Sequence, residues 1–198
     1  MKKDISKIKT GSKLYVLIDA SNVWNAIKSA RKFIDYKKLK DYFENNLEAK
    51  NIRFFYYDAF PEEGTREYDV SKKHNFYTYL KKGLGFTVRK KKLKLVHITN
   101  DDGEKEVKEK GNMDVEMTID LVEKIDEYDA VFLFSGDVDF LALANYLKRY
   151  NKKIYIFSTK GNISNELKTG GSGYFELKDM KCIWGKELVR REKQNHPQ

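Results

Sequence analysis

The chain has 198 residues, of which 40% are hydrophobic and 14% aromatic, and its formal net charge is +9. This length is enough to fill one hydrophobic core and is short for two domains, so we expect a single domain. Cys182 is the only cysteine, which excludes a disulfide framework and a zinc site made of cysteines. The positive charge favours a polyanionic partner such as nucleic acid, although a basic surface without a partner would have the same charge.

Both ends of the chain are polar. Residues 1–13 are rich in lysine and lack the apolar core of a signal peptide, so we expect a basic, mobile N-terminal arm there. The single domain is expected over residues 14–185, and residues 186–198 are expected to form a polar tail. No apolar run approaches the roughly 20 residues that a membrane-spanning helix needs. We therefore expect a cytoplasmic protein without a membrane partner.

Apolar runs alternate with segments of helical spacing along the rest of the chain. The runs that predict strands are residues 14–18, 52–57, 86–89, 93–98, 131–134 and 154–157. The segments that predict helices are residues 36–47, 65–82, 112–125, 137–150 and 163–168. Residues 100–110 are highly charged and predict an exposed loop. Strands that alternate with helices predict an α/β fold, a three-layer α/β/α sandwich with a mostly parallel central sheet.

Acidic side chains follow two of the predicted strands. Asp19 comes directly after the strand at 14–18, and Asp137 and Asp139 follow the strand at 131–134 where a helix begins. Open α/β sheets bind their ligands beyond the carboxyl ends of the strands. Close carboxylates repel one another unless a cation or a proton lies between them. The pair after residue 134 therefore favours a divalent metal.

Another acid begins the predicted helix 112–125. The residues three and seven positions after Asp114 are Met117 and Leu121, so Asp114 lies on the apolar side of this helix, which faces the sheet. Oxygen ligands without cysteine or histidine suit Mg²⁺ or Mn²⁺. The predicted metal ligands and catalytic residues are Asp19, Asp114, Asp137 and Asp139, supported by Asn22 and Ser135. Any one of these acids alone is equally well explained as a helix cap.

Three segments together resemble a known family. IDASN (18–22), KEKGNMDVEMTIDL (108–121) and FSGDVDF (134–140) are similar, in this order, to the NYN domain, LabA-like branch, of the PIN-like metal-dependent ribonucleases. The resemblance covers roughly residues 14–177. It implies a PIN-like α/β fold and an acidic metal site that cleaves RNA. By position, the family's acids fall on Asp19, Asp114, Asp137 and Asp139, with Asn22 accompanying the first.

The match to the family pattern is less regular before Asp114. Family members often have one short apolar residue between Lys-Gly and the acid, whereas Asn112 and Met113 both stand between Gly111 and Asp114 here. Asp120 is a weaker candidate, because six residues from Asp114 place it on another face of the helix.

Basic residues gather between the predicted helix 65–82 and the strands that follow it. The predicted RNA-binding residues are Lys81, Lys82, Arg89, Lys90, Lys91, Lys92 and Lys94. A cationic track with aromatic rings nearby is typical of surfaces that bind RNA without sequence specificity. A solvated hairpin whose lysines discourage edge pairing would show the same pattern. Trp24 lies just after the first acidic strand, and we expect it to pack in the core.

These observations predict a metal-dependent ribonuclease that binds RNA, and a homodimer that aligns two basic surfaces is a reasonable expectation. The alternative is an RNA-binding module with the same fold and no catalysis. A nucleotide-sugar transferase would use residues 137–139 as its metal motif, but it leaves Asp19, Asn22 and Asp114 without a role. An aspartyl phosphatase would have Thr or Val where this chain has Leu141.

Overall fold

A parallel sheet forms the centre of the fold. The computed structural model describes residues 5–61, 70–99 and 105–189. The strands of the sheet are β1 (Lys13–Asp19), β3 (Asn51–Phe60), β4 (Thr87–Lys92), β7 (Ala130–Phe134), β8 (Lys153–Ser158) and β9 (Gly173–Glu176). They lie in the order β4-β3-β1-β7-β8-β9, and every neighbouring pair is parallel.

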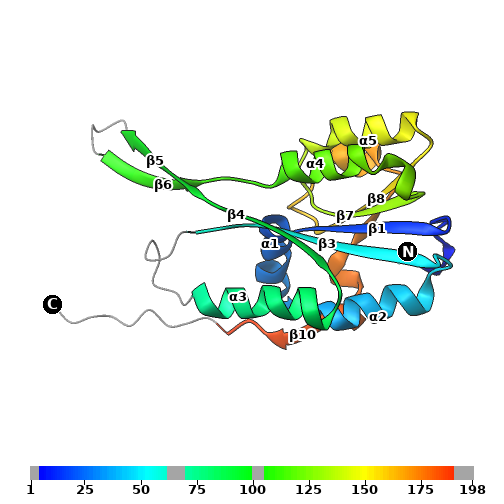
Figure 1. Ribbon diagram of the computed structural model, residues 1–198, viewed down its shortest axis with the longest axis horizontal. Helices are drawn as coiled ribbons and strands as arrows, with labels where there is room; N and C mark the ends of the chain where they lie inside the picture. Colours follow the sequence, from blue (N-terminus) through cyan, green and yellow to red (C-terminus); the bar gives the residue numbers. More distant parts are fainter. Residues whose placement is uncertain (1–4, 62–69, 100–104, 190–198) are drawn as a thin grey trace.

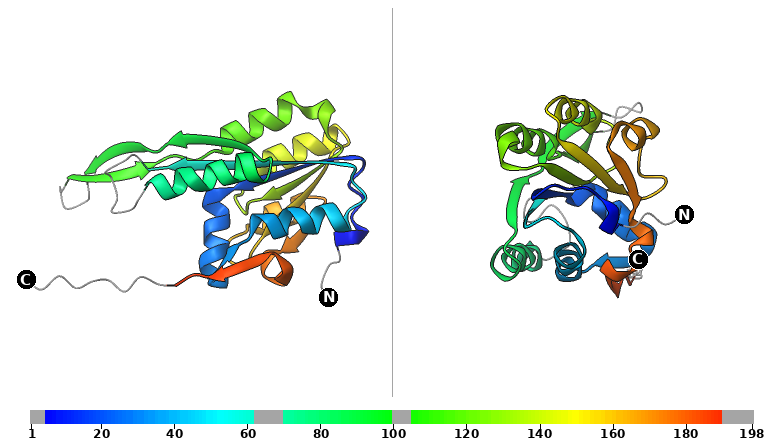
Figure 2. Two further views of the ribbon diagram at one scale, coloured as in Figure 1. Left: turned by 60° about the horizontal axis from the view of Figure 1, so that its bottom comes forward. Right: turned by 90° about the vertical axis from the view of Figure 1, so that its right-hand side faces the viewer.

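Helices cover both faces of this sheet. One face carries α1 (Ala20–Ala30), α2 (Tyr36–Asn46) and α3 (Val70–Thr78), and α3 continues into a π-helical turn, η2 (Tyr79–Gly83). The other face carries α4 (Asp114–Glu123), α5 (Phe140–Arg149) and α6 (Asn165–Gly170). Figure 2 shows the sheet between these two layers. The predicted three-layer α/β/α sandwich with a parallel sheet is therefore confirmed.

The apolar strands are buried on both faces. In β1, Leu14, Val16 and Ile18 join the core under α1 and α2, whereas Tyr15 and Leu17 join the core under α4 and α5. A strand that faces helices on both sides must be apolar at every position instead of at alternate ones. This explains why the strands were recognisable as unbroken apolar runs.

The order of the strands decides where the acids meet. β1 lies between β3 and β7, and the carboxyl end of β1 is in register with that of β7, since Ile18 is opposite Phe134. The chain leaves β1 toward β3 on one side and returns to β7 on the other. Such a point of reversal opens a crevice at the carboxyl ends of the strands. Asp19, Asp137 and Asp139 all follow these two ends.

The ends of the domain differ from the prediction. Residues 5–7 form a short 3-10 helix, η1 (Ile5–Lys7), and Ile5 and Ile8 are buried in the core, so the expected mobile arm is wrong for residues 5–13. At the other end, β10 (Trp184–Glu187) pairs antiparallel with β2 (Lys32–Ile34), so residues 186 and 187 belong to a strand. At both ends a few apolar side chains pack against the core, although most of the neighbouring residues are polar or charged. Residues 1–4 and 190–198 lie outside the described residues.

The predicted loop at 100–110 is also wrong in part. Residues 105–110 form β6 (Lys105–Lys110), which pairs antiparallel with β5 (Lys94–Thr99) in a two-stranded ribbon that extends away from the helices (Figure 1). This strand was not predicted because its sequence is mostly charged and contains no apolar run. It is a strand because its backbone pairs with β5. Residues 65–69 of the predicted helix and 100–104 of the predicted loop lie outside the described residues.

The remaining elements are short. They are η3 (Ile125–Glu127), η4 (Leu177–Asp179) and η5 (Lys181–Ile183). Within the described ranges, none of the helices is both long and apolar enough to span a lipid bilayer.

Candidate metal centre

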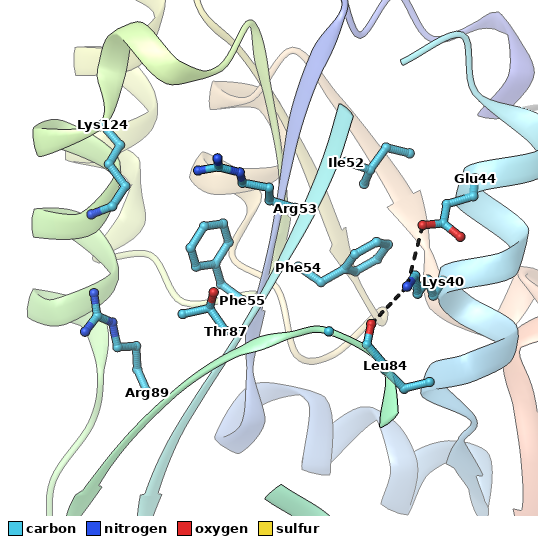
Figure 3. Close-up of a pocket in the computed structure, with 11 residues that line it drawn as sticks. Lys40, Glu44, Ile52, Arg53, Phe54, Phe55, Leu84, Thr87, Arg89 and Lys124 are labelled. Carbon is cyan, nitrogen blue, oxygen red and sulfur yellow. Dashed lines mark hydrogen bonds and ion pairs between the residues drawn. The ribbon is translucent and has the colours of Figure 1, made fainter. Parts of the chain in front are cut away.

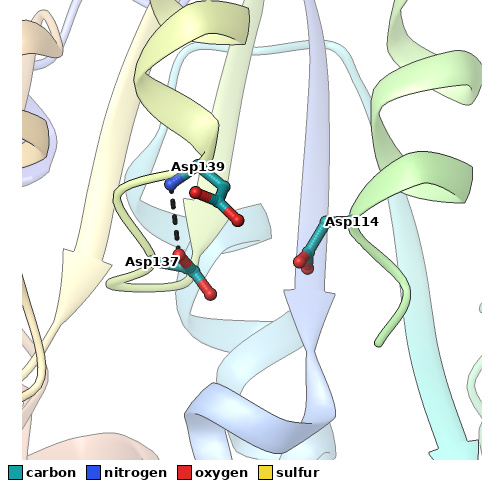
Figure 4. A group of neighbouring side chains, drawn as sticks. All are labelled: Asp114, Asp137 and Asp139. Atoms are coloured by element: carbon teal, nitrogen blue, oxygen red, sulfur yellow. Dashed lines mark hydrogen bonds between the residues drawn. The ribbon is translucent and has the colours of Figure 1, made fainter. Parts of the chain in front are cut away.

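Three carboxylates converge beyond the carboxyl ends of β1 and β7. Asp114 is the first residue of α4, and Asp137 and Asp139 lie in the turn between β7 and α5. Each contributes an oxygen atom, and these atoms lie within 4.8 Å of one another. Figure 4 shows Asp114 pointing from α4 toward the other two acids. The fold thus brings together three of the four predicted metal ligands from two segments far apart in sequence.

Local hydrogen bonds hold these acids in place. The carboxylate of Asp137 accepts a hydrogen bond from the backbone N–H of Asp139 at 3.1 Å, and the Asp137 N–H donates to the Ser135 hydroxyl at 3.3 Å. The side-chain amide of Asn112 donates to the carboxylate of Asp114. Asp114 and Asp139 stand at the starts of α4 and α5, where the partial positive charge of a helix terminus favours acids.

The electrostatics of the cluster favour a cation. The pKa of Asp114 is raised to about 6, first by burial and then by the negative charges of Asp19, Asp137 and Asp139. A carboxyl group whose neighbours disfavour its charged form gains most from an ion that neutralises them. The donors are all carboxylate oxygens, which are the ligands that Mg²⁺ and Mn²⁺ prefer. The residues present therefore fit a hard divalent cation.

Asp19 lies beside this group and is not part of it. Its side chain is buried, and one carboxylate oxygen accepts hydrogen bonds from the Ser21 N–H at 3.0 Å and the Ser21 hydroxyl at 2.8 Å. The other oxygen accepts from the Asn22 side-chain amide at 2.8 Å and the Ser135 hydroxyl at 3.1 Å. Asp19 therefore caps α1 and ties β1 to β7. Of the predicted supporting residues, Asn22 holds Asp19, and Ser135 holds Asp19 while its hydroxyl also accepts a hydrogen bond from the backbone N–H of Asp137.

Two residues that complete this scaffold, Gly136 and Asn162, were not predicted as part of the site. The side-chain oxygen of Asn22 accepts hydrogen bonds from the backbone N–H of Gly136 at 3.0 Å and from the side chain of Asn162 at 3.1 Å. Asn162 follows β8, the strand next to β7. Asn162 could have been predicted from the sequence, because the polar stretch that follows the predicted strand at 154–157 begins at the same edge of the sheet as the acids.

Comparison with known proteins places this geometry in a family. A family model of the NYN domain matches residues 13–177. The chain belongs to the NYN domain family. The resemblance predicted from the three motifs is therefore confirmed, and with it a place among the PIN-like nuclease superfamily.

Two relatives support the assignment of this NYN domain. It is 30% identical over 176 residues to the low amplitude and bright protein LabA of Synechococcus elongatus, and the match covers 87% of each chain. A crystal structure of a protein of unknown function from Vibrio parahaemolyticus has the same fold, with a TM-score of 0.65 and 25% identity. That match covers 90% of this chain and 99% of the other.

Another buried acid of the NYN domain, Asp58 on β3, does not join the metal centre. It is buried, and it pairs with Lys73 at 3.0 Å and accepts a hydrogen bond from the Tyr77 hydroxyl at 2.9 Å. Burial raises the pKa of Asp58, and the ammonium of Lys73 opposes this rise. Asp58 therefore has a cation of its own.

Some of the predicted RNA-binding residues of the NYN domain pair with acids of the protein, and others are exposed to solvent. Arg89 donates two hydrogen bonds to Asp120, through Nε at 3.2 Å and Nη2 at 3.1 Å, and Asp120 also accepts from the Tyr57 hydroxyl at 2.7 Å. Arg89 thus holds the edge strand β4 against α4. Asp120 lies with Arg89 and Tyr57, outside the group of three acids, so the expectation that it occupies another face agrees with the structure.

The lysines of β4 alternate between its two faces. Lys91 pairs with Glu116 of α4 at 2.6 Å, and its charge lowers the pKa of Asp114, which places Lys91 at the margin of the metal centre. Lys90 faces the other way, with its ammonium 5.2 Å from the centre of the Tyr77 ring. Lys81 and Lys82 are exposed on η2, and Lys94 is exposed on β5.

A cavity of about 350 Å³ lies at the other end of the sheet (Figure 3). Its walls come from the first residues of β3 and β4, from α2, from residues 84–85 before β4, and from Lys124, which follows α4. Lys40 donates to the backbone carbonyl of Leu84 at 2.9 Å and lies 3.8 Å from the carboxylate of Glu44. The cavity lies at the amino ends of these strands, away from the acids, and its cation Lys40 has partners within the protein.

The raised pKa of Asp114 predicts how metal binding depends on pH. In the metal-free protein Asp114 takes up a proton as the pH falls through its pKa of about 6, whereas in the unfolded chain it does so near the ordinary pKa of an aspartate, 3.8. This carboxyl group therefore stabilises the metal-free fold at low pH, and that stability is lost as the pH rises through 6. Metal binding has the opposite dependence, because the ligand must be deprotonated.

We expect the affinity for Mn²⁺ to fall about tenfold per pH unit below pH 6 and to change little between pH 7 and 8. Isothermal titration calorimetry at pH 5, 6, 7 and 8 would measure it. An affinity at pH 5 equal to that at pH 7 would contradict the role of Asp114 as a ligand. The Asp114→Asn variant is the control, since its residual affinity should lack this dependence on pH.

Proposed function

We propose that this NYN domain is a metal-dependent ribonuclease that hydrolyses phosphodiester bonds of RNA. The observation that carries the proposal is the convergence of Asp114, Asp137 and Asp139, whose oxygen atoms lie within 4.8 Å of one another at the reversal point of the sheet. Membership of the NYN family and the excess of basic residues support it. The proposed cofactor is Mg²⁺ or Mn²⁺, held by these three acids.

Each part of the centre has a distinct role in this proposal. A divalent ion bound there would lower the pKa of a water molecule and offset the charge that develops on the phosphodiester, so no side-chain nucleophile is needed. Asp114, Asp137 and Asp139 hold the ion, and their net negative charge makes the position selective for cations. Asp19 acts as a positioning residue, since its hydrogen bonds fix the ends of β1 and β7 relative to each other.

The basic residues supply the RNA-binding surface in the proposal. Lys91 lies at the margin of the metal centre, where its ion pair with Glu116, at 2.6 Å, can be exchanged for a contact with the phosphate next to the bond that is cut. The other proposed phosphate contacts are Lys81, Lys82, Lys90, Lys92 and Lys94. Arg89 was expected among them, but its two hydrogen bonds to Asp120 assign it to holding β4 in place.

A second candidate function is RNA binding without cleavage. The saturation of Asp19 by hydrogen-bond donors favours it, because only three acids remain for the metal. Such a module would bind RNA with an affinity that falls steeply with salt, since each neutralised phosphate releases counterions.

Incubation of the purified chain with labelled structured and unstructured RNAs would separate the two functions. We expect cleavage in Mn²⁺ or Mg²⁺ and none in EDTA. Binding in every buffer without cleavage in any would overturn the nuclease and support the binding module. Absence of both binding and cleavage would overturn both functions.

A further inference from the structure

Aromatic side chains are exposed at several places on the molecule, and three of them lie at or beside one groove. Among the described residues, the aromatic side chains that are largely exposed are Trp24 at 44%, Phe33 at 41%, Tyr79 at 46% and Tyr150 at 52%. The first three come from separate segments, α1, β2 and η2. Phe33 and Tyr79 line one groove, and Trp24 lies beside Phe33. Trp24 was expected in the core, and that expectation is wrong, because α1 packs on the sheet through Val23, Ala26 and Ile27.

The groove has a volume of about 560 Å³. Phe33 and Tyr79 line it together with Phe76 and the buried ring of Tyr36, which lie 5.6 Å apart between ring centres. Trp24 extends the row of rings, since its ring centre is 6.2 Å from that of Phe33. Large rings exposed around one groove are costly in water and mark a site of interaction.

Two lysines border the groove. Lys186 lines it, and Lys37, which pairs with Asp41 at 2.6 Å, is close enough to Tyr79 for the two side chains to interact electrostatically. The acid in the lining, Asp35, caps α2, because one of its oxygens accepts hydrogen bonds from the N–H groups of Lys37 and Lys38, both at 3.1 Å. Aromatic rings bordered by lysines are the combination that binds bases by stacking and phosphates by charge.

The groove is connected to the metal centre through α1. This helix begins directly after Asp19, and Trp24 is five residues further, which corresponds to about 7.5 Å along the helix axis. Trp24 therefore lies on the helix that leaves the sheet edge where the acids gather, and its ring neighbours that of Phe33 in the groove.

We propose that this groove is a nucleobase-binding subsite in which Trp24, Phe33 and Tyr79 stack on unpaired bases of the bound RNA. The inference rests on the proposed function for the identity of the ligand. Bases paired in a duplex are stacked on one another and cannot lie on these rings. The subsite thus selects RNA that is unpaired next to the metal centre.

Tryptophan fluorescence provides a direct test of stacking. The chain has two tryptophans, so the Trp184→Phe variant leaves Trp24 as the only one. In EDTA, addition of an unpaired RNA oligonucleotide should quench its emission, whereas an oligonucleotide of the same length without bases should not. Emission that stays constant up to saturation of RNA binding would overturn the proposal.

Affinity measurements give a second, independent test. In EDTA, Trp24→Ala and Tyr79→Ala should each raise the dissociation constant for unpaired RNA at least about fivefold, as expected for the loss of one stacked base. The matched control is Tyr150→Ala, which removes an equally exposed ring at the end of α5 on the opposite face of the sheet and should leave the affinity unchanged. Affinity for a duplex of the same sequence should be the same for Trp24→Ala and the unmodified chain.

The failure of this proposal is distinguishable from the failure of the nuclease. RNA binding that depends on Trp24, without cleavage in any metal, would support the subsite and overturn the nuclease. Metal-dependent cleavage with kcat/KM unchanged by Trp24→Ala would overturn the subsite and leave the nuclease in place. A groove that binds a protein partner instead would show no response of Trp24 to RNA, which also overturns the subsite.

Discussion

Replacing Asp137 with asparagine is expected to reduce metal-dependent cleavage of RNA by more than roughly 100-fold, because even residues that only orient metal ligands contribute 10- to 100-fold. Asparagine keeps the oxygen atom that accepts the hydrogen bond from the Asp139 N–H at 3.1 Å, so the turn after β7 should keep its shape. The substitution removes one negative charge from a group of three. The loss should therefore come from weaker metal binding and not from a changed fold.

Thermal unfolding with and without Mn²⁺ would check this without any assay of activity. A ligand at 100 times its dissociation constant stabilises a protein by about 2.7 kcal/mol, which for a domain of this size raises Tm by roughly 5–10 °C. Asp137→Asn should lose most of this rise. In EDTA the variant should be at least as stable as the unmodified chain, because the repulsion among the acids is reduced.

Asp126→Asn is the matched control for this prediction. Asp126 is an exposed acid in η3, outside the group of three, so the same chemical change should leave both the Mn²⁺ response and the cleavage intact. If Asp137→Asn kept its Mn²⁺ response and its activity, the acids would not be the metal centre.

The strand ends made most of this centre predictable from sequence. Unbroken apolar runs at 14–18 and 131–134 identify strands buried on both faces, and the acids that follow them must lie at one edge of a parallel sheet. Asp114 followed from the helical spacing of Met117 and Leu121. Each of these patterns spans only a few residues of sequence, and the order of the strands in the sheet then brings the acids close together.

The partners of the polar side chains could not be predicted in the same way. The hydrogen bond from Ser135 to Asp19 joins residues 116 positions apart, and it decides that Asp19 is saturated. Arg89 belongs to a run of basic residues in sequence, yet its ion pair with Asp120 depends on how closely α4 packs against β4. Which cations remain available for a ligand is a property of the packed fold.

The exposure of Trp24 could not be predicted from the sequence either, because it also depends on how the elements pack. The sequence gives no strong start or stop signal for α1 beyond Asp19, so the face on which Trp24 lies was not predictable. The composition of a segment indicates that some of its side chains are buried. Which side chains are buried depends on the face that the helix turns toward the sheet. The row of rings from Trp24 to Tyr79 is visible only after three distant segments are placed together.

Gly136 is expected to be the most sensitive position without a functional side chain. A Cβ atom at Gly136 would lie 1.7 Å from the carbonyl oxygen of Asn162 and 2.7 Å from the Ser158 hydroxyl, so the turn after β7 must move if it is present. The N–H of Gly136 also donates to Asn22, which connects this turn to Asp19. Gly136→Ala should therefore destabilise the fold by about 2–3 kcal/mol, as overpacking does, and abolish the Mn²⁺ response.

Gly161→Ala is the matched control, because it is the same substitution in the segment that Gly136 contacts. Gly161 has a φ of +85° and open space around its Cα, so an alanine there costs only the strain of a left-handed conformation, about 1–2 kcal/mol. The metal-free Tm of this variant should be lower than that of the unmodified chain. We expect the rise in Tm that Mn²⁺ causes to be the same in both. Equal losses of stability and Mn²⁺ response in the two variants would show that the loops around the acids respond to any added methyl group, and that the close approach at Gly136 has no special role in placing Asp137 and Asp139.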